Sequence, residues 1–210
     1  MTSGTTSCSA PPRGSVAGVS DSIWVFGYGS LVSPDSLGGT LGRQPVRGLD
    51  FLAAECDGWE RRWNYGMAVA DGALVGPDVD RVDVVVALGV VAVEGACMNG
   101  IITEVHPDEL VRLDARERNY DRVDVTDGVR LLEEGPSIAD LGRVVTYVPR
   151  QVALDIYLDG RDRGRAGIER RYWDLVDGAF DVLLPGQGER YRSTTPAPDV
   201  PVVDANRAGR

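Results

Sequence analysis

The order of two hydrophobic patterns along the chain constrains its fold more than any other feature. Between residues 22 and 149, segments rich in β-branched and aromatic residues alternate with turn residues, a pattern typical of β-strands. From Gln151 onward, apolar residues recur at helical spacing, first over residues 154–158 and again over residues 168–180. Many strands followed by two helices predict an α+β fold, in which helices pack outside a curled sheet or small barrel.

Turn residues divide the strand-like part of the chain. The first strand begins at Ile23 and runs into a Gly-rich loop. Asp57-Gly58 is a hairpin dipeptide, so residues 51–67 predict two strands that meet there. Gly89 predicts a bulge in the next strand. The further strands are expected over residues 82–95, 97–105, 120–125 and 142–149.

One helix is expected among these strands, over residues 106–117. Pro107 suits the first helical turn, and the acidic residues Asp108 and Glu109 suit the positive end of the helix dipole. His106, which precedes them, is expected to lie on the surface or to cap this helix.

Both ends of the chain differ from its middle. Residues 1–21 are small, polar and rich in Pro and Gly, and they predict a disordered leader. Residues 22–190 predict a single domain, and residues 191–210 a Pro-rich extended tail. No apolar run is long enough for a secretory signal at the start or for a membrane span elsewhere, so we expect a cytoplasmic protein without a membrane partner.

The charged and reactive residues exclude several classes of function. The net charge of −10 argues against nucleic acid as a partner, because binding phosphates requires a basic face. The sequence has no lysine, which excludes a Walker-type phosphate loop and Schiff-base chemistry. A single histidine and three widely spaced cysteines give no familiar metal motif, so neither a metal nor a cofactor is expected. Cys56 and Cys97 are interpreted as small core residues.

The loop Gly27-Tyr28-Gly29-Ser30 directly follows the first predicted strand. Its glycines allow a sharp turn in which successive backbone N–H groups point into one concavity and bind an anion. A dinucleotide-binding fingerprint would need glycine where Val32 stands, and a nucleophile elbow needs a different order around the serine. From the residues alone, an anion-binding nest and a plain Gly-rich turn remain open.

Glu117 lies at the expected end of a helix, close to Tyr120. A buried carboxylate there would have its pKa raised by desolvation and by the negative end of the helix dipole, which suits proton transfer near neutral pH. The alternative, favoured by composition alone, is that Glu117 pairs on the surface with Arg116, Arg118 or Arg122.

Four segments taken together are more specific than any one of them. VFGYGSL, NGIITEV, LDARERNYDRVDV and VVTYVP occur in this order, and the chain over about residues 23–180 resembles the γ-glutamylcyclotransferase-like superfamily, including its ChaC-type and AIG2-like branches. The resemblance implies a small mixed β-barrel flanked by helices. It also implies cleavage of a small-molecule γ-glutamyl amide to 5-oxoproline and a free amine, without metal or cofactor.

The resemblance also assigns roles to residues of this chain. The glycine loop of the family falls on Tyr28, Gly29, Ser30 and Leu31, its catalytic glutamate on Glu117, and its substrate-binding aromatic residues on Tyr120 and Tyr147. Two alternatives stay open: a cyclotransferase that acts on a γ-glutamylamine or removes a biosynthetic protecting group, and a binding or regulatory domain without turnover.

Two further groups of residues have competing interpretations. Arg61 and Arg62, with Trp63, could offer a guanidinium to a substrate carboxylate, but a solvated strand face is favoured. The aromatic residues Tyr157, Tyr172 and Trp173 are expected in the core or at its rim, with a wall of the substrate site as the alternative.

Overall fold

The computed structural model describes residues 23–70, 72–135 and 137–207. The leader predicted over residues 1–21 lies outside the described residues. Among the helices of the described part, none is long and apolar enough to cross a membrane.

The main sheet has eight strands, and two long strands form its centre. β2 (Phe51–Ala68) and β4 (Val84–Val105) pair antiparallel along most of their length. The hydrogen-bonded order is β5-β7-β1-β4-β2-β6, and β8 pairs with the far end of β4. The remaining strands of this sheet are β1 (Ile23–Gly27), β5 (Tyr120–Asp124), β6 (Val129–Leu131), β7 (Val144–Pro149), β8 (Ala166–Glu169) and β9 (Val202–Val203).

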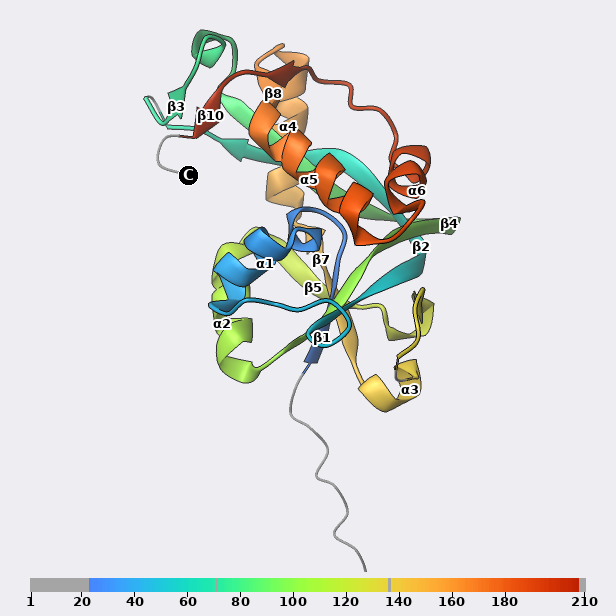
Figure 1. Cartoon of the computed structure of the whole chain (residues 1–210). Helices are drawn as coiled ribbons and strands as arrows, with labels where there is room; N and C mark the ends of the chain where they lie inside the picture. The colour runs from blue at the N-terminus through green and yellow to red at the C-terminus, as the bar shows by residue number, and fades with distance from the viewer. Residues whose placement is uncertain (1–22, 71, 136, 208–210) are drawn as a thin grey trace, which may run out of the picture.

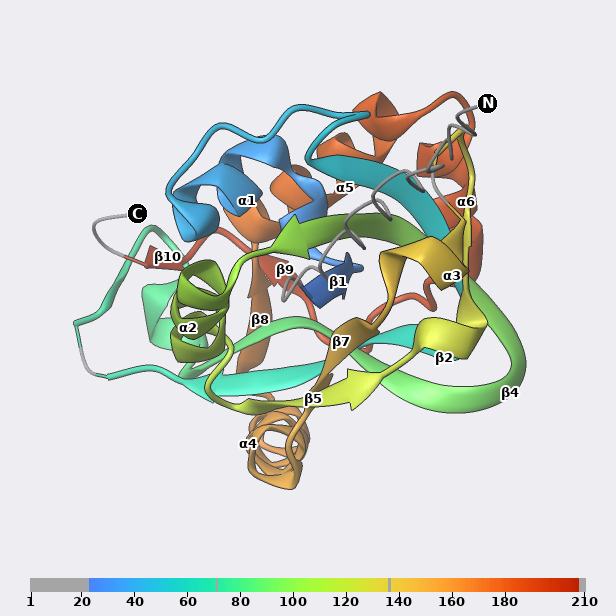
Figure 2. The same ribbon diagram turned by 90° about the horizontal axis from the view of Figure 1, so that it is seen from below.

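Parallel and antiparallel pairs both occur, so the sheet is mixed. β1 pairs antiparallel with β4 but parallel with β7, and β8 pairs parallel with β4 and β9. A second, two-stranded sheet joins β3 (Leu74–Val75) to β10 (Asn206–Arg207). Figure 2 shows how the bent strands curl around β1.

Helices cover both sides of the β2–β4 ribbon. α4 (Gln151–Asp162) lies on one side, and α5 (Arg170–Leu183) and α6 (Gln187–Thr194) lie on the other (Figures 1 and 2). α1 (Pro34–Leu41) and α2 (Pro107–Arg116) pack together beside β1, and the short α3 (Ile138–Leu141) precedes β7. Three single-turn 3₁₀ helices complete the described structure: η1 (Ser30–Val32), η2 (Val79–Arg81) and η3 (Thr126–Gly128).

The predicted α+β class and the mixed sheet flanked by helices are confirmed. The helix after His106 and the two later helices are also present, as α2, α4 and α5. The sequence patterns missed α1, α3 and α6. Helix α6 crosses the boundary expected between the domain and its tail, and the chain after it contributes β9 and β10 to the two sheets.

The hairpin predicted at Asp57-Gly58 is wrong, because β2 continues through both residues. Gly58 has a φ of +81°, and the pairing register with β4 shifts between Asp57 and Trp59. The dipeptide therefore forms a bulge within a long ribbon.

The two strands expected over residues 82–95 and 97–105 are likewise one strand, β4. Its Gly95 has a φ of +77° and lies in the same irregularity. The bulge expected at Gly89 is not in this strand, because Gly89 pairs with Arg62. A second register shift follows this pair, between Arg62 and Tyr65, and its extra residue lies on β2.

Close backbone contact at a glycine holds α4 against the sheet. A Cβ atom on Gly66 of β2 would lie 2.3 Å from the backbone nitrogen of Tyr157 and 2.6 Å from its Cα. Neither backbone atom can move without shifting the whole helix, so this position has no room for a side chain.

We therefore expect Gly66→Ala to lower the free energy of unfolding by about 1–3 kcal/mol, as overpacking does. Urea denaturation would measure it. Gly39→Ala is the matched control, since a Cβ on this exposed glycine of α1 meets no atom within 4 Å. Gly39→Ala should stabilise the chain by up to about 1 kcal/mol. Equal effects of the two substitutions would contradict the close contact.

Candidate active site

The residues that the resemblance assigns to the site converge on one narrow cavity of about 40 Å³. It lies where the end of β1, the end of α2 and the start of β5 meet, and Phe26, Leu88 and Tyr172 complete its wall. The assigned residues that line it are Tyr28, Gly29, Ser30, Leu31, Glu117, Tyr120 and Tyr147. Their role in binding substrate stays a prediction.

The glycine loop carries the chain from β1 into the single turn η1. A Cβ on Gly27 would lie 2.9 Å from the Cβ of Leu31, so the turn is too tight for a larger residue. Within the described residues, no carbonyl accepts a hydrogen bond from the backbone N–H groups of Gly29, Ser30 or Leu31. These N–H groups are therefore available to an anion or a polarised carbonyl.

Glu117 caps the C-terminus of α2. Its backbone N–H donates to the carbonyl of Leu113 at 2.8 Å, and the fully buried Leu113 anchors the helix in the core. The Glu117 side chain is only 15 % exposed. Burial raises the pKa of this carboxyl above its ordinary value of 4.5, and the guanidinium of Arg116 opposes the rise. The expected helix-end carboxylate with a raised pKa is present.

The alternative expectation for Glu117 is a surface ion pair with Arg116, Arg118 or Arg122, and the structure contains the pair with Arg116. Arg116 Nε lies 3.1 Å from Glu117 Oε1. Arg116 is shared, however, because it also donates to Ser30 Oγ at 2.7 Å and to Ser36 Oγ at 3.2 Å. The guanidinium thus ties α1, the glycine loop and Glu117 together, while the carboxyl itself stays mostly buried.

The phenol protons of the three assigned tyrosines are already engaged by the protein. Tyr28 donates to the carbonyl of Tyr147 at 2.7 Å, and Tyr120 donates to the carbonyl of Leu88 at 3.1 Å. Tyr147 donates to Asp114 Oδ1 at 2.7 Å. Burial raises the pKa of each phenol, and the charge of Glu117 adds to the rise, so all three stay protonated at neutral pH. They shape the cavity, and Glu117 is the single carboxyl among the residues lining it.

Tyr172 is part of the cavity wall, although the sequence favoured a place in the core or at its rim. Its hydroxyl accepts a hydrogen bond from the backbone N–H of Leu88 at 3.4 Å, and burial raises its pKa to about 12. A Cβ on Gly29 would lie 3.3 Å from this hydroxyl, so α5 packs directly against the glycine loop. Helical spacing placed Tyr172 on an apolar face but gave no sign of which strand that face meets.

Arg61 corrects the expectation of a solvated strand face, because its side chain is fully buried. It donates to Asn99 Oδ1 at 2.6 Å and to the hydroxyls of Thr194 and Thr195 at 2.9 Å. Burial lowers the pKa of Arg61 to about 9, which still leaves the group charged at neutral pH. It does not line the cavity and instead fixes the end of α6 to the sheet.

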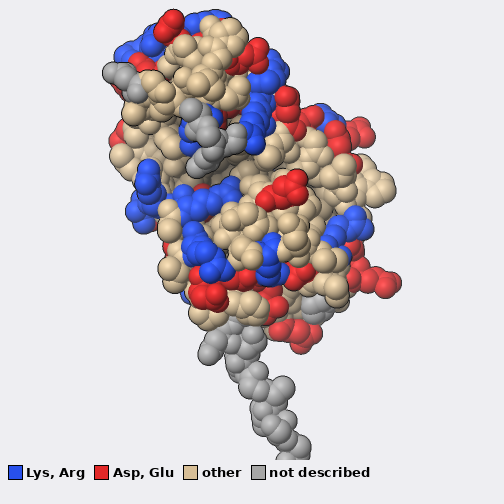
Figure 3. Space-filling model, turned by 60° about the vertical axis from the view of Figure 1, so that its left-hand side comes forward, with Lys and Arg blue, Asp and Glu red and all other residues tan. Residues whose placement is uncertain are grey.

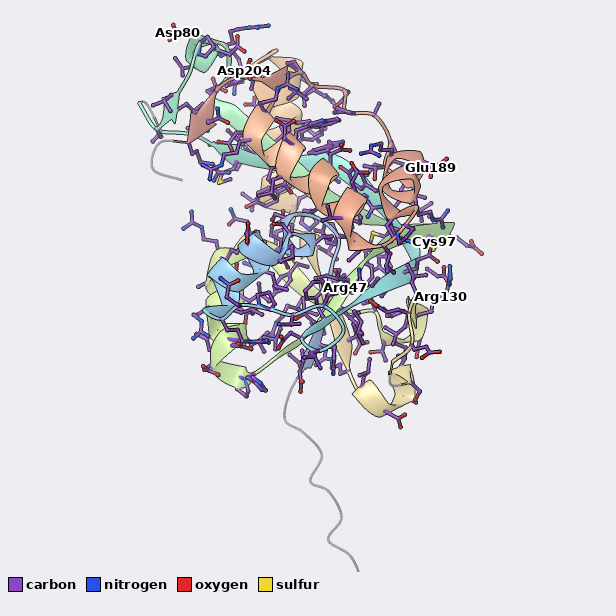
Figure 4. The ribbon with its side chains drawn as sticks, in the orientation of Figure 1. Arg47, Asp80, Cys97, Arg130, Glu189 and Asp204 are labelled. Atoms are coloured by element: carbon purple, nitrogen blue, oxygen red, sulfur yellow. The ribbon has the colours of Figure 1, made fainter. Side chains whose placement is uncertain are left out.

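The remaining singled-out residues lie outside the cavity. His106 is the N-cap residue of α2, and its backbone N–H donates to Glu109 Oε2 at 3.0 Å, so the capping interpretation is confirmed. Cys56 is buried as expected, but Cys97 is only partly buried and its Sγ lies 3.4 Å from Arg130 Nη2 (Figure 4). Within the described ranges, no three His, Cys, Asp or Glu side chains are grouped to hold a metal.

Comparison with known proteins supports the fold. No family model and no curated protein matches the sequence. A structure of a gamma-glutamyl cyclotransferase is 12% identical, with a TM-score of 0.52 over 84% of this chain and 90% of that one. An uncharacterized protein from Homo sapiens, loc79017, is 13% identical, with the same TM-score and coverage. A glutathione-specific gamma-glutamyl cyclotransferase from yeast is 15% identical over 61% of this chain and 69% of that one, with a TM-score of 0.42.

The two structures with a TM-score of 0.52 show that the chain has the γ-glutamyl cyclotransferase-like fold, as the sequence resemblance implied. The fold does not by itself assign an activity.

The raised pKa of Glu117 has a consequence for stability. The pKa of this carboxyl is higher in the folded than in the unfolded state, so its ionisation destabilises the fold. Its contribution to stability is fully present at pH values below the pKa of the unfolded state. The contribution is lost as the pH rises through the pKa of the folded state. Glu117→Gln should therefore raise the melting temperature at pH 7, and the gain should disappear below about pH 4. Thermal melts across this range would measure it, with exposed Glu94→Gln as control. A loss of stability at pH 7 would contradict the burial argument.

Proposed function

We propose that the chain is a cofactor-independent cyclotransferase that converts a γ-glutamyl amide to 5-oxoproline and a free amine. The observation that carries the proposal is the buried carboxyl of Glu117, which shares one cavity with the glycine loop, whose N–H groups donate to no carbonyl of the described residues. The fold shared with a gamma-glutamyl cyclotransferase supports it.

The substrate supplies its own nucleophile. Its α-amine attacks the γ-carbonyl carbon, the new C–N bond closes a five-membered lactam, and the C–N bond to the leaving amine breaks. No water is consumed, and no nucleophile from the protein is required. What the protein must provide is a folded substrate conformation and a group that transfers protons from the α-ammonium to the leaving nitrogen.

Glu117 transfers protons in the proposed mechanism. As a carboxylate it accepts a proton from the α-ammonium, and as a carboxylic acid it then donates this proton to the leaving nitrogen. The ring nitrogen loses a second proton as the lactam forms, and this proton passes to the released amine, which leaves as an ammonium. A pKa raised by burial suits the second role, because the carboxyl holds a proton more readily than an exposed glutamate does before it passes that proton on. Among the groups that line the cavity, the tyrosines keep their protons at neutral pH and cannot replace it.

The glycine loop stabilises developing charge in this mechanism. As the amine attacks, negative charge accumulates on the γ-carbonyl oxygen, and the N–H groups of Gly29, Ser30 and Leu31 are donors without an internal partner. Arg116 holds the Ser30 side chain, so the loop keeps its shape before substrate binds.

Release of 5-oxoproline tests the proposal directly. The wild-type chain should release it from at least one of glutathione, γ-glutamylcysteine, a γ-glutamyl amino acid or a γ-glutamyl amine. Glu117→Gln should lower kcat by about 10²–10⁴-fold, because it removes a proton-transfer group. Near-full turnover by Glu117→Gln would exclude the assigned role.

The pH dependence provides a second test, based on the position of Arg116. Since this guanidinium lowers the pKa of Glu117, Arg116→Gln should raise that pKa further. The acidic limb of the kcat/KM profile should then move to higher pH, because a base must lose its proton before it can act. Arg143→Gln, which removes an exposed arginine paired with Asp124, is the control. A limb that stays in place or moves to lower pH would contradict the coupling.

A further inference from the structure

A second, wider groove opens directly from the candidate active site. Its volume is about 660 Å³, within the range of about 300–1,000 Å³ that is usual for ligand sites. Ser30, Glu117, Tyr120 and Tyr172 line both the narrow cavity and this groove. A molecule held in the cavity can therefore extend into the groove past these four residues, among which Glu117 is the carboxyl.

The walls of the groove come from two distant parts of the chain. One wall is the end of α2 and the residue that follows Glu117, Arg118. The opposite wall is formed by the end of β8 and the start of α5 and, from the C-terminal segment, by β10 with Asn206 and Arg207. Met67, Ala87 and Leu175 add apolar surface between the walls. The C-terminal segment is thus part of the groove.

Charge is distributed differently in the groove than in the chain as a whole. Four arginines and three carboxyl groups line it, whereas the chain has a net charge of −10. Figure 3 brings this side of the molecule forward. It shows basic side chains gathered around the hollow between the upper and lower parts of the molecule in that view. The charged residues lining the groove are Arg116, Arg118, Arg171, Arg207, Asp35, Glu117 and Glu169.

Arg118 is the arginine best placed to meet a ligand. Arg207 is already held by Glu169, with Nη2 3.2 Å from Oε2, and Arg116 is engaged with Ser30 and Glu117. The Arg118 side chain is exposed, and its guanidinium makes no ion pair with a described residue. An exposed guanidinium beside the carboxyl that protonates the leaving nitrogen is suited to bind an anionic group a few bonds further along the substrate.

On this basis we infer that the groove binds the leaving amine, that this amine is large and carries a carboxylate or similar anion, and that Arg118 is the residue that selects for the negative charge. The inference rests on the proposed cyclotransferase reaction, in which Glu117 faces the leaving nitrogen. Arg118 is a specificity-determining residue in this account and takes no part in proton transfer.

The test uses one matched pair of substrates and the full chain. γ-Glutamyl-alanylglycine carries a free carboxylate on its leaving group, and the same compound as its C-terminal carboxamide does not. For the wild type, kcat/KM for 5-oxoproline release should favour the carboxylate. Arg118→Gln should reduce that preference by about 2- to 5-fold through KM, the size expected for an exposed ion pair, with kcat unchanged. Arg118→Lys should retain part of the preference, and the remote Arg143→Gln should retain all of it.

Binding measurements separate this inference from the reaction on which it rests. Calorimetric titration of both compounds into Glu117→Gln should show tighter binding of the carboxylate, and the additional substitution Arg118→Gln should remove the difference. If the wild type releases no 5-oxoproline but this difference in binding is found, the proposed reaction fails and the groove assignment stands. Any of three results would overturn the inference: turnover of both compounds without a preference, binding of neither compound, or an Arg118→Gln variant that keeps the full preference for the carboxylate.

Discussion

The antiparallel pairing of β2 with β4 supports the rest of the structure. Both strands are unusually long, 18 and 22 residues, and each continues through two register shifts, the first of which contains Gly58 and Gly95 in the left-handed region. One end of β4 pairs with β1 and its other end pairs with β8, while β6 adds to β2. The ribbon therefore fixes where β1 ends and the glycine loop begins. It also directs β4 into α2, which places Glu117 opposite that loop.

Two opposing electrostatic effects act on the carboxyl of Glu117. Desolvation favours the neutral acid, and the neighbouring guanidinium favours the carboxylate. The effect of burial is the larger of the two, and Arg116 also donates hydrogen bonds to Ser30 and Ser36. The hydroxyls of Tyr28, Tyr120 and Tyr147 donate to backbone carbonyls or to Asp114, and not to this carboxyl. The surroundings thus keep Glu117 able to take up and release a proton, at some cost in stability.

Short-range sequence patterns predicted those helices and strands whose formation depends on neighbouring residues. Period and capping residues located α2, α4 and α5. The motif over residues 113–125 placed Glu117 at the end of a helix and Tyr120 at the start of a strand, as the structure has them. The hairpin at Asp57-Gly58 failed because the same dipeptide fits a bulge, and only pairing with the distant β4 decides between them. The expectation that Arg61 is solvated fails for a similar reason, since its partners Thr194 and Thr195 lie more than 130 residues away in the sequence. The second wall of the groove, from β10, has no local signal at all.

The proposed mechanism requires Glu117 to be a buried carboxyl with a raised pKa, and not one half of a surface ion pair. Its pKa can be measured directly by a ¹³C NMR titration of the glutamate side-chain carboxyls, with Glu117→Gln used to assign the resonance. A midpoint clearly above the ordinary value of 4.5 is the predicted result. A midpoint at or below that value would mean that pairing with Arg116 outweighs burial, and it would contradict the assignment of Glu117 as the proton-transfer group.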